Sequence, residues 1–230
     1  MPSGNSQLVT AEITNSTFVG PKVHAVPSIG LEAVVLGGSL SNCSFVGQAS
    51  GQRCPLAYRA QLDHCTVFGF GTGGNPLFDD AIVDRCTIMQ TRSAPNSLLD
   101  GAGTTTRLMN SIVDGHIGPI TDVMGNTFVS YSRTPGPLPP GPGNIIADAR
   151  LYAPLSGDAR LGSGSPAIDA GDPAQLDSDG MRLDMGAFPR LPSQAAPEAL
   201  AFCDGLRTSE LCVPTITSTS TAQTRAGHSA

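Results

Sequence analysis

Two acidic residues, Asp63 and Asp84, are the first candidates for chemistry in this chain. They lie 21 residues apart, and each is followed by a side chain that can carry positive charge, His64 or Arg85. If the two segments lie side by side, the like charges raise a carboxyl pKa or attract a cation. Paired carboxylates also carry out glycoside hydrolysis. A plainer interpretation stays open, in which Arg85 neutralises both carboxylates on a solvated surface.

Other residues extend this list of candidate binding groups. Asp79 and Asp80 precede the segment that holds Asp84 and could enlarge the acidic patch. Lyase chemistry on a uronate needs a base and cations that neutralise the carboxylate, yet Lys22 is the only lysine of the chain. Aromatic side chains among Ser- and Thr-rich strands would suit a shallow glycan groove, and they are Tyr58, Phe68, Phe70 and Phe78.

A separate acidic segment near the C-terminus could bind calcium. Asp177, Asp179 and Asp184 surround Gly180, and hard oxygen ligands at alternate positions followed by glycine are typical of a calcium loop. The segment lacks the glutamate that completes such a loop. The alternative is an Asp/Gly turn in which Arg182 pairs with an aspartate.

A short phrase that occurs six times must position these residues. Successive copies begin 27, 22, 21, 25 and 16 residues apart. A period of about twenty residues predicts one structural unit per copy, each stacked on the last. The copies begin at Asn15, Asn42, His64, Arg85, Asn110 and Asn126.

The aligned copies predict which side chains point inward. The first position is mostly Asn, which tolerates the left-handed backbone of a sharp bend. Apolar residues stand two positions before it, and polar and apolar residues alternate after it, as in strands. The position after the bend is a small, inward column of Ser16, Cys43, Cys65, Cys86, Ser111 and Thr127. This pattern predicts a coil of parallel strands about 4.8 Å apart.

The phrase resembles the right-handed parallel β-helix family, which includes pectate lyases and many bacterial surface proteins, and its Asn column resembles that family's asparagine ladder. Residues 161–172 and 177–187 are similar to the end region of bacterial β-helix proteins of the choice-of-anchor-Q type. The resemblance implies an exported, surface-associated protein in which residues 144–189 close the C-terminal end of the coil. Ser165 and Pro166 predict one helical turn that ends at Gly171.

We therefore expect an all-β, single-stranded right-handed parallel β-helix with an irregular C-terminal cap. Residues 1–143 form the rungs and 144–189 the cap. Residues 190–230 form a tail with a short helix at 195–206 and a disordered Ser/Thr-rich end. The first residues lack an export signal, so we expect further rungs and that signal upstream.

Cysteine usage separates two groups. Cys43, Cys65 and Cys86 share the inward column, where small reduced thiols behave as hydrophobes, and a metal or redox site is the alternative. In an exported chain Cys203 and Cys212 could form a disulfide. Cys54 has no assigned partner.

Composition limits the function classes. Aromatic residues make up 5% of the chain, Trp is absent, and Gly (27) and Pro (19) are abundant, which favours many turns over helices. A net charge of −6 disfavours nucleic acids and anionic membranes as partners. No apolar run is long enough for a membrane span, and the oligomeric state is not indicated.

These observations lead to three hypotheses. The first is an exported surface solenoid that is carbohydrate-binding, adhesive or structural, with no required cofactor beyond possible Ca²⁺. The second is a polysaccharide lyase or glycoside hydrolase that acts on an acidic polysaccharide through the face of Asp63 and Asp84. The third is a rigid stalk that holds another domain away from the cell.

Overall fold

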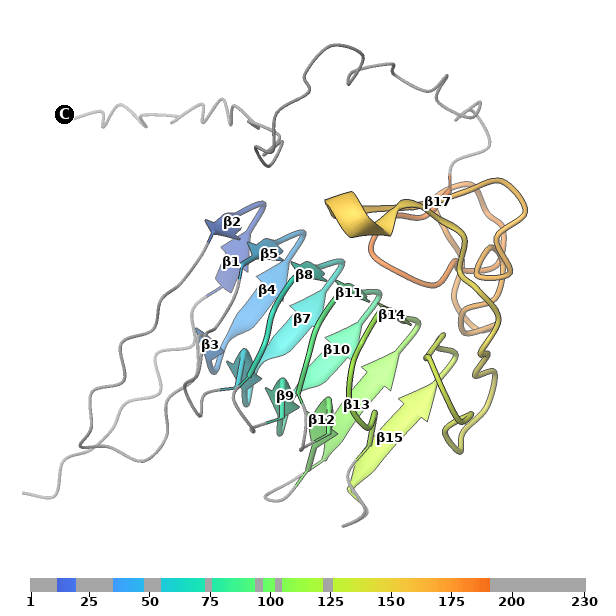
Figure 1. The fold of residues 1–230 in the computed structure, drawn as a ribbon. Coiled ribbons are helices and arrows are strands. Elements are labelled where there is room, and N and C mark those ends of the chain that lie inside the picture. Colours follow the sequence, from blue (N-terminus) through green and yellow to red (C-terminus); the bar gives the residue numbers. More distant parts are fainter. Residues whose placement is uncertain are drawn as a thin grey trace, which may run out of the picture. The chain divides into compact units, whose positions relative to one another are not determined.

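The computed structural model describes residues 12–19, 35–47, 55–72, 76–93, 97–101, 105–121 and 126–190 (Figure 1). These residues contain β-strands and one short 3-10 helix but no α-helix. The strands of successive copies pair in parallel and form three stacked sheets. The predicted fold class, a parallel β-solenoid, is confirmed.

Sheet A has six strands, and each follows the last by one rung of the coil. Its inward residues are the apolar column predicted from the sequence, with Leu40, Leu62, Val83 and Leu108 at most 1% exposed. The register is continuous, because Leu40 pairs with Leu62 and Val83 with Leu108. The strands in spatial order are β1 (Glu12–Thr14), β4 (Ser39–Ser41), β7 (Gln61–Asp63), β10 (Ile82–Asp84), β13 (Thr106–Met109) and β15 (Thr127–Ser130).

Sheets B and C complete each rung around the same core. The five strands of sheet B are β2 (Thr17–Val19), β5 (Ser44–Val46), β8 (Thr66–Phe68), β11 (Thr87–Met89) and β14 (Ile112–Asp114). The four short strands of sheet C are β3 (Val35–Leu36), β6 (Ala57–Tyr58), β9 (Phe78–Asp79) and β12 (Leu99–Asp100).

A left-handed residue makes the bend from sheet A to sheet B, as predicted. The φ angle is 48–53° at five positions, which are Asn15, Asn42, His64, Arg85 and Asn110. The prediction of a sixth bend at Asn126 is wrong. Thr127 pairs with Thr106 and Ser130 with Met109, so the bend falls five residues later at Tyr131, where φ is 47°. Hydrogen bonding to the neighbouring strand decides the register, and the Asn-Thr match at 126 was coincidental.

The small column after the bend is a polar ladder. Each side chain donates to the carbonyl oxygen two residues earlier, for example Cys86 Sγ to Asp84 O at 3.0 Å and Ser132 Oγ to Ser130 O at 2.8 Å. On the later rungs the side chain also accepts from the backbone of the preceding rung, for example Ser111 Oγ from the N–H of Cys86 at 3.0 Å. Cys and Ser can replace one another along this column because both are small and can donate and accept hydrogen bonds. Ser132, not Thr127, continues the ladder on the last rung.

The C-terminal segment packs beside the coil. It contains β16 (Leu151–Ala153), the 3-10 helix η1 (Pro154–Ser156) and β17 (Asp158–Leu161), with β16 and β17 antiparallel. Its apolar residues pack on Ile112 of β14 and form a second buried cluster on the outward side of sheet B. The other members of this cluster are Ala149, Leu161, Ala167 and Met185. The outward Thr column of sheet B is therefore partly covered, and Thr87 is fully buried and accepts the N–H of Ala187 at 2.9 Å.

The Pro-rich loop (residues 135–143), with Asn144, covers the edge of the last rung. Tyr131 N–H donates to Pro142 O at 2.8 Å, and the Asn144 side chain binds Ser132 N–H and Val129 O. The resemblance implied that residues 144–189 close this end. In the structure the loop does so together with Asn144 and Ile145, which pairs in parallel with Arg133, whereas residues near the end of that range contact sheet B.

The rest of the predicted organisation has mixed outcomes. The expected helical turn is a single hydrogen-bonded turn, in which Ile168 N–H donates to Ser165 O at 3.3 Å. The chain divides into compact units 1–196 and 197–230, and the boundaries at 143 and 189 stay predictions. Cys54, the helix at 195–206 and the Cys203–Cys212 disulfide lie outside the described residues. No helix in the described part is long and apolar enough to cross a membrane.

Candidate functional site

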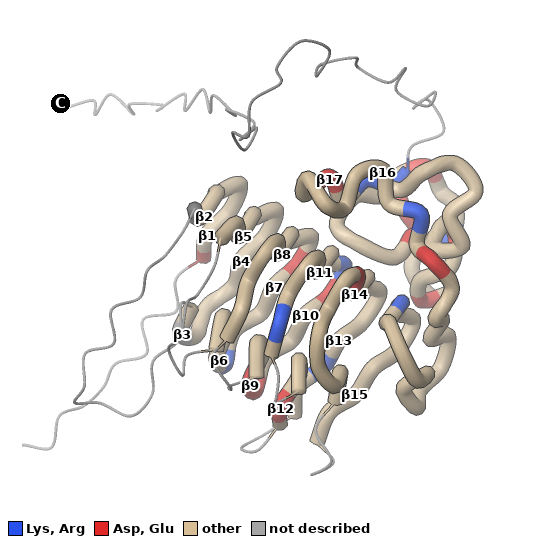
Figure 2. Tube along the Cα trace, in the orientation of Figure 1, with Lys and Arg blue, Asp and Glu red and all other residues tan. Residues whose placement is uncertain are grey.

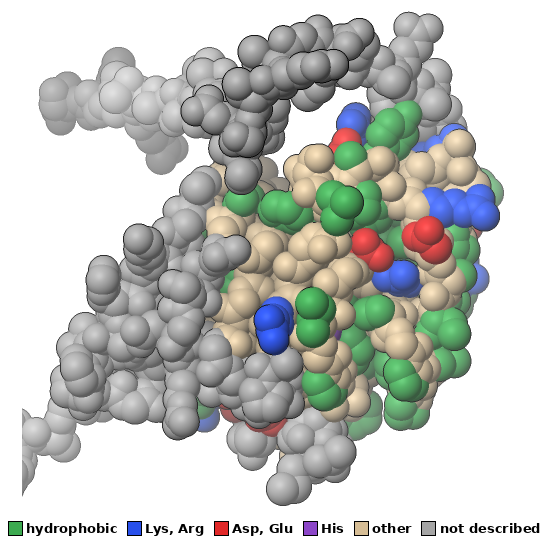
Figure 3. All heavy atoms as spheres, in the orientation of Figure 1, with side chains coloured by type: hydrophobic (Ala, Val, Ile, Leu, Met, Phe, Trp, Pro, Cys, Tyr) green, Lys and Arg blue, Asp and Glu red, His purple; other side chains and the backbone are tan. Residues whose placement is uncertain are grey.

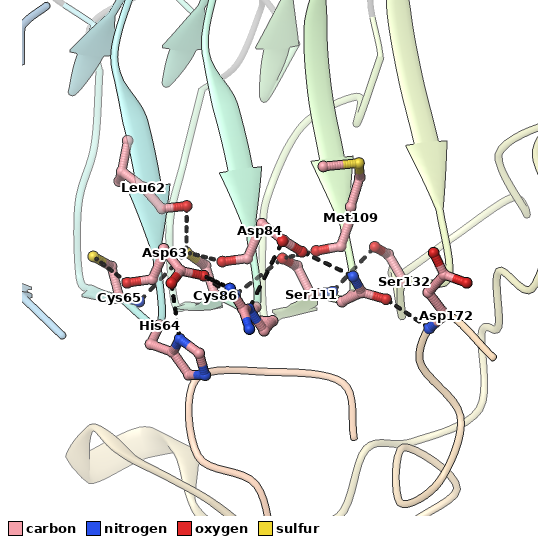
Figure 4. Close-up of polar contacts among 12 residues, drawn as sticks. Leu62, Asp63, His64, Cys65, Asp84, Cys86, Met109, Ser111, Ser132 and Asp172 are labelled. Carbon is pink, nitrogen blue, oxygen red and sulfur yellow. Dashed lines mark hydrogen bonds and ion pairs between the residues drawn. The ribbon is translucent and has the colours of Figure 1, made fainter. Parts of the chain in front are cut away.

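Asp63 and Asp84 lie side by side, as the sequence predicted. They end β7 and β10 and are direct partners in sheet A, and their side chains meet at the bend (Figure 4). Arg85 lies between them, with Nη2 2.8 Å from Asp63 Oδ1 and Nε 3.7 Å from Asp84 Oδ2. The guanidinium therefore compensates both carboxylates.

Two further side chains extend this group. His64 Nδ1 lies 3.1 Å from Asp63 Oδ2, and Asn110 Nδ2 donates to Asp84 Oδ1 at 2.9 Å. We call Asp63, His64, Asp84, Arg85 and Asn110 the bend network. The left-handed backbone that the repeat imposes at His64, Arg85 and Asn110 brings their side chains to the carboxylates. All four carboxylate oxygens of the network have a partner.

The bend network also joins the coil to the C-terminal segment. Asn110 is 1% exposed, and its Oδ1 accepts the N–H of Asp172 at 2.7 Å while its carbonyl oxygen accepts the N–H of Gly186 at 2.8 Å. Figure 4 shows the chain of contacts from His64 to Asp172. The arrangement favours the plainer interpretation, in which the charges balance and position neighbouring segments.

A second acidic cluster lies on sheet C. Asp79 pairs in register with Asp100, and the buried side chain of Asp80 lies 3.6 Å from Arg59 Nε. The pKa of Asp79 is raised to about 6, chiefly by burial and then by the charges of Asp100 and Asp80, while Arg59 opposes the shift. The sequence reasoning named Asp79 and Asp80 but missed Asp100. The rung period was the available signal, because Asp100 follows Asp79 by 21 residues.

The aromatic residues proposed for a glycan groove do not share a surface. Phe70 and Phe78 are core residues, 1% and 0% exposed. Phe68 is half-buried, and Gly157 of the C-terminal segment packs over its ring. Tyr58 is covered by the Arg59 guanidinium, 4.9 Å from the ring centre.

The proposed calcium ligands hold the backbone of their own segment. Asp184 is 3% exposed, and its two oxygens accept N–H groups of Asp169 and Arg190 at 2.7 and 2.6 Å. Asp177 Oδ2 accepts the N–H of Asp184 at 2.8 Å, and burial raises the pKa of both carboxyls. Asp179 Oδ1 likewise accepts the N–H of Met181 at 2.9 Å.

Arg182 does not take the role expected of it. Instead of pairing with an aspartate, it donates to the carbonyl oxygens of Gly171 and Ala170. Within the described residues, no three or more His, Cys, Asp or Glu side chains are arranged to hold a metal ion. Calcium binding stays a prediction.

The outward residues of sheet A are exposed or half-buried, and we call this side the sheet A face. Its outer row contains Glu12, Ser39, Gln61, Ile82, Arg107 and Phe128 in register. Phe128 is 60% exposed and pairs with Arg107, which is also exposed. The sequence reasoning did not select these two residues, although the alternation with Leu108 and Val129 placed both outward.

Charges of both signs are scattered along the coil (Figure 2). On the side drawn in Figure 3, uncharged and apolar side chains cover most of the described coil, and charged groups gather mainly over the C-terminal segment. No single-sign field extends along the described rungs in these views.

The fold defines the chain as a parallel β-solenoid. No family model, curated protein or solved structure matches it.

Proposed function

We propose that this chain is a non-catalytic solenoid that binds a linear polysaccharide along the sheet A face. The observation that carries the proposal is the outer row of this face, where Gln61, Ile82, Arg107 and Phe128 follow one another on paired strands. Parallel strands repeat such groups every 4.8 Å or so. A regular ladder of contacts suits a ligand that is itself a regular chain.

The chemistry of the row supports a sugar ligand. Phe128 offers an exposed aromatic ring on which the apolar face of a sugar can stack. Arg107 offers planar donors suited to hydroxyl or carboxylate oxygens, and it makes no ion pair with another described residue. Gln61 adds an exposed donor and acceptor further along the row.

The bend network supports the non-catalytic form of the proposal. A lyase or hydrolase working through Asp63 and Asp84 needs a carboxylate that is available to the substrate. Here Arg85, His64 and Asn110 already occupy the oxygens of both. Chemistry there would first have to break these contacts.

Export to the cell surface is part of the same proposal. It rests on the similarity of residues 161–172 and 177–187 to the end region of choice-of-anchor-Q proteins. In that setting the solenoid would hold its sheet A face toward polysaccharides outside the cell.

Retention on immobilised polysaccharides tests the proposal. The purified chain is applied to polygalacturonate, alginate, mannan and β-glucan, and we expect retention on at least one of them. Phe128→Ala and Arg107→Ala should each weaken retention at least tenfold. Leu138→Ala removes a side chain that is 55% exposed in the Pro-rich loop and serves as the matched control.

Two results of the retention assay would overturn the proposal. One is the absence of retention on every polysaccharide, and the other is an equal loss in Leu138→Ala. Cleavage is followed in parallel with Asp63→Asn/Asp84→Asn. Product formation that disappears in this double variant would replace the binding function with a lyase or hydrolase.

A further inference from the structure

Three thiols stand in one line inside the coil. Cys43, Cys65 and Cys86 occupy the same ladder position on consecutive rungs, between register pairs that are continuous on both sides. They are 2%, 0% and 0% exposed, and all are free. Figure 4 shows Cys65 and Cys86 on neighbouring rungs.

The spacing of a parallel sheet decides what two such thiols can form. Equivalent atoms on adjacent strands lie about 4.8 Å apart, whereas a disulfide needs Cβ atoms about 3.8 Å apart. Two metal–thiolate bonds of about 2.3 Å, the zinc–sulfur length, on opposite sides of one ion would separate the sulfurs by roughly 4.6 Å. The rung spacing therefore fits a linear two-coordinate ion and not a disulfide.

We propose that the Cys65–Cys86 pair binds one soft monovalent ion of the Cu(I) or Ag(I) class in linear coordination. Thiolate sulfur is the ligand that selects such ions. A pair of sulfurs is sufficient for two-coordination, so the site does not require a cluster of three metal-binding side chains.

Two-coordination, not charge, selects the ion. Both sulfurs bind as thiolates, so binding one monovalent ion releases two thiol protons and leaves one net negative charge at the pair. The backbone N–H of Cys65, which donates to Cys86 Sγ at 3.4 Å, partly compensates this charge.

The column offers a route to the site. Its first described member, Ser16, is only half-buried, and Cys43 lies between Ser16 and the pair. The Cys43 thiol donates to Ile13 O at 3.5 Å and Ser41 O at 3.4 Å. These weak bonds can open to pass an ion from sulfur to sulfur.

The ladder itself supplies variants that should fold. Serine already stands at three ladder positions, Ser16, Ser111 and Ser132, and each donates to the carbonyl oxygen two residues earlier, so Cys→Ser keeps the backbone satisfied. The reduced full chain is titrated with Ag(I), and separately with Cu(I) under anaerobic conditions against a chromogenic chelator. Far-ultraviolet circular dichroism reports the fold throughout.

We expect one tightly held ion per chain, two sulfurs at about 2.3 Å by X-ray absorption, and a higher melting temperature with the ion bound. Cys65→Ser and Cys86→Ser should each lose at least a hundredfold in affinity, while Cys43→Ser keeps the affinity. Equal binding by all three variants, no binding by the folded chain, or loss of the β-sheet signal on titration would each overturn the proposal.

Discussion

Replacement of Asn110 by Gly should release the C-terminal segment from the coil. Asn110 is buried and left-handed, and its side chain bridges Asp84 on β10 and the N–H of Asp172. Gly accepts the left-handed backbone without strain, so Asn110→Gly removes the side-chain contacts and leaves the bend in place.

The contacts set the size of the effect. A hydrogen bond to a charged carboxylate contributes about 1.5–3 kcal/mol and a neutral one about 0.5–1.5 kcal/mol. Asn110→Gly should therefore lower the free energy of unfolding by roughly 2–4 kcal/mol. Glycine also gives the unfolded chain more backbone freedom, and this lowers the free energy of unfolding by a further amount of about 0.5–1 kcal/mol.

Asn42→Gly is the matched control. Asn42 has the same place in the repeat and a φ of 53°, but its side chain is exposed and makes no hydrogen bond with another described residue. Asn42→Gly should lower the free energy of unfolding only by the amount that comes from the greater backbone freedom of glycine in the unfolded chain. Equilibrium denaturant unfolding measures both variants, and hydrogen exchange at the Asp172 and Gly186 amides locates the loss. Equal destabilisation of the two variants would refute the role of Asn110.

Two other predictions follow from single contacts. Burial raises the pKa of Asp79 to about 6, so the folded state holds this proton more tightly than the unfolded chain, whose carboxyl titrates near 4. The stability that the protonated Asp79 carboxyl contributes to the folded state is complete below about pH 4 and is lost as the pH rises to about 6. At pH 7 Asp79→Asn should be more stable than the wild type by about 1 kcal/mol, a value already reduced because Asp79 is partly exposed. Thermal unfolding at pH 7 and pH 4 measures this difference in stability. A difference that does not become smaller at pH 4 would contradict the prediction. Gly141→Ala would place a Cβ 1.9 Å from Val129 O, whereas Gly136→Ala meets no atom within 4 Å. We expect Gly141→Ala to cost about 1–3 kcal/mol more than Gly136→Ala in denaturant unfolding, and equal costs would show that the loop does not close on the last rung.

Local periodicity was enough to predict the coil. The alternation around each bend and the left-handed Asn positions recur because the backbone of every rung makes the same bend between two strands. The same periodicity brought Asp63 and Asp84 together, since equal positions on successive rungs must become neighbours. Where the period failed, at Asn126, only pairing between β13 and β15 set the register.

The partners of these residues depended on tertiary contacts. Nothing in the local sequence showed that Asn110 would be buried by Asp172 and Gly186, or that Thr87 would be covered by Ala187. All three contacts join positions more than sixty residues apart in the chain. Repetition within a strand does not encode which surface a later, non-repeating segment will cover.

The sequence by itself determined the solenoid, its inward columns and the stack of thiols and carboxylates. A strict repeat fixes these features because each rung contacts the next in the same way. Only the tertiary structure decided that the carboxylates are compensated by Arg85, that the C-terminal segment partly covers sheet B, and that Gln61, Arg107 and Phe128 of the sheet A face are exposed. The first outcome depends on side-chain contacts between neighbouring rungs. The second depends on how a segment without a repeat packs on the coil, through contacts between distant residues.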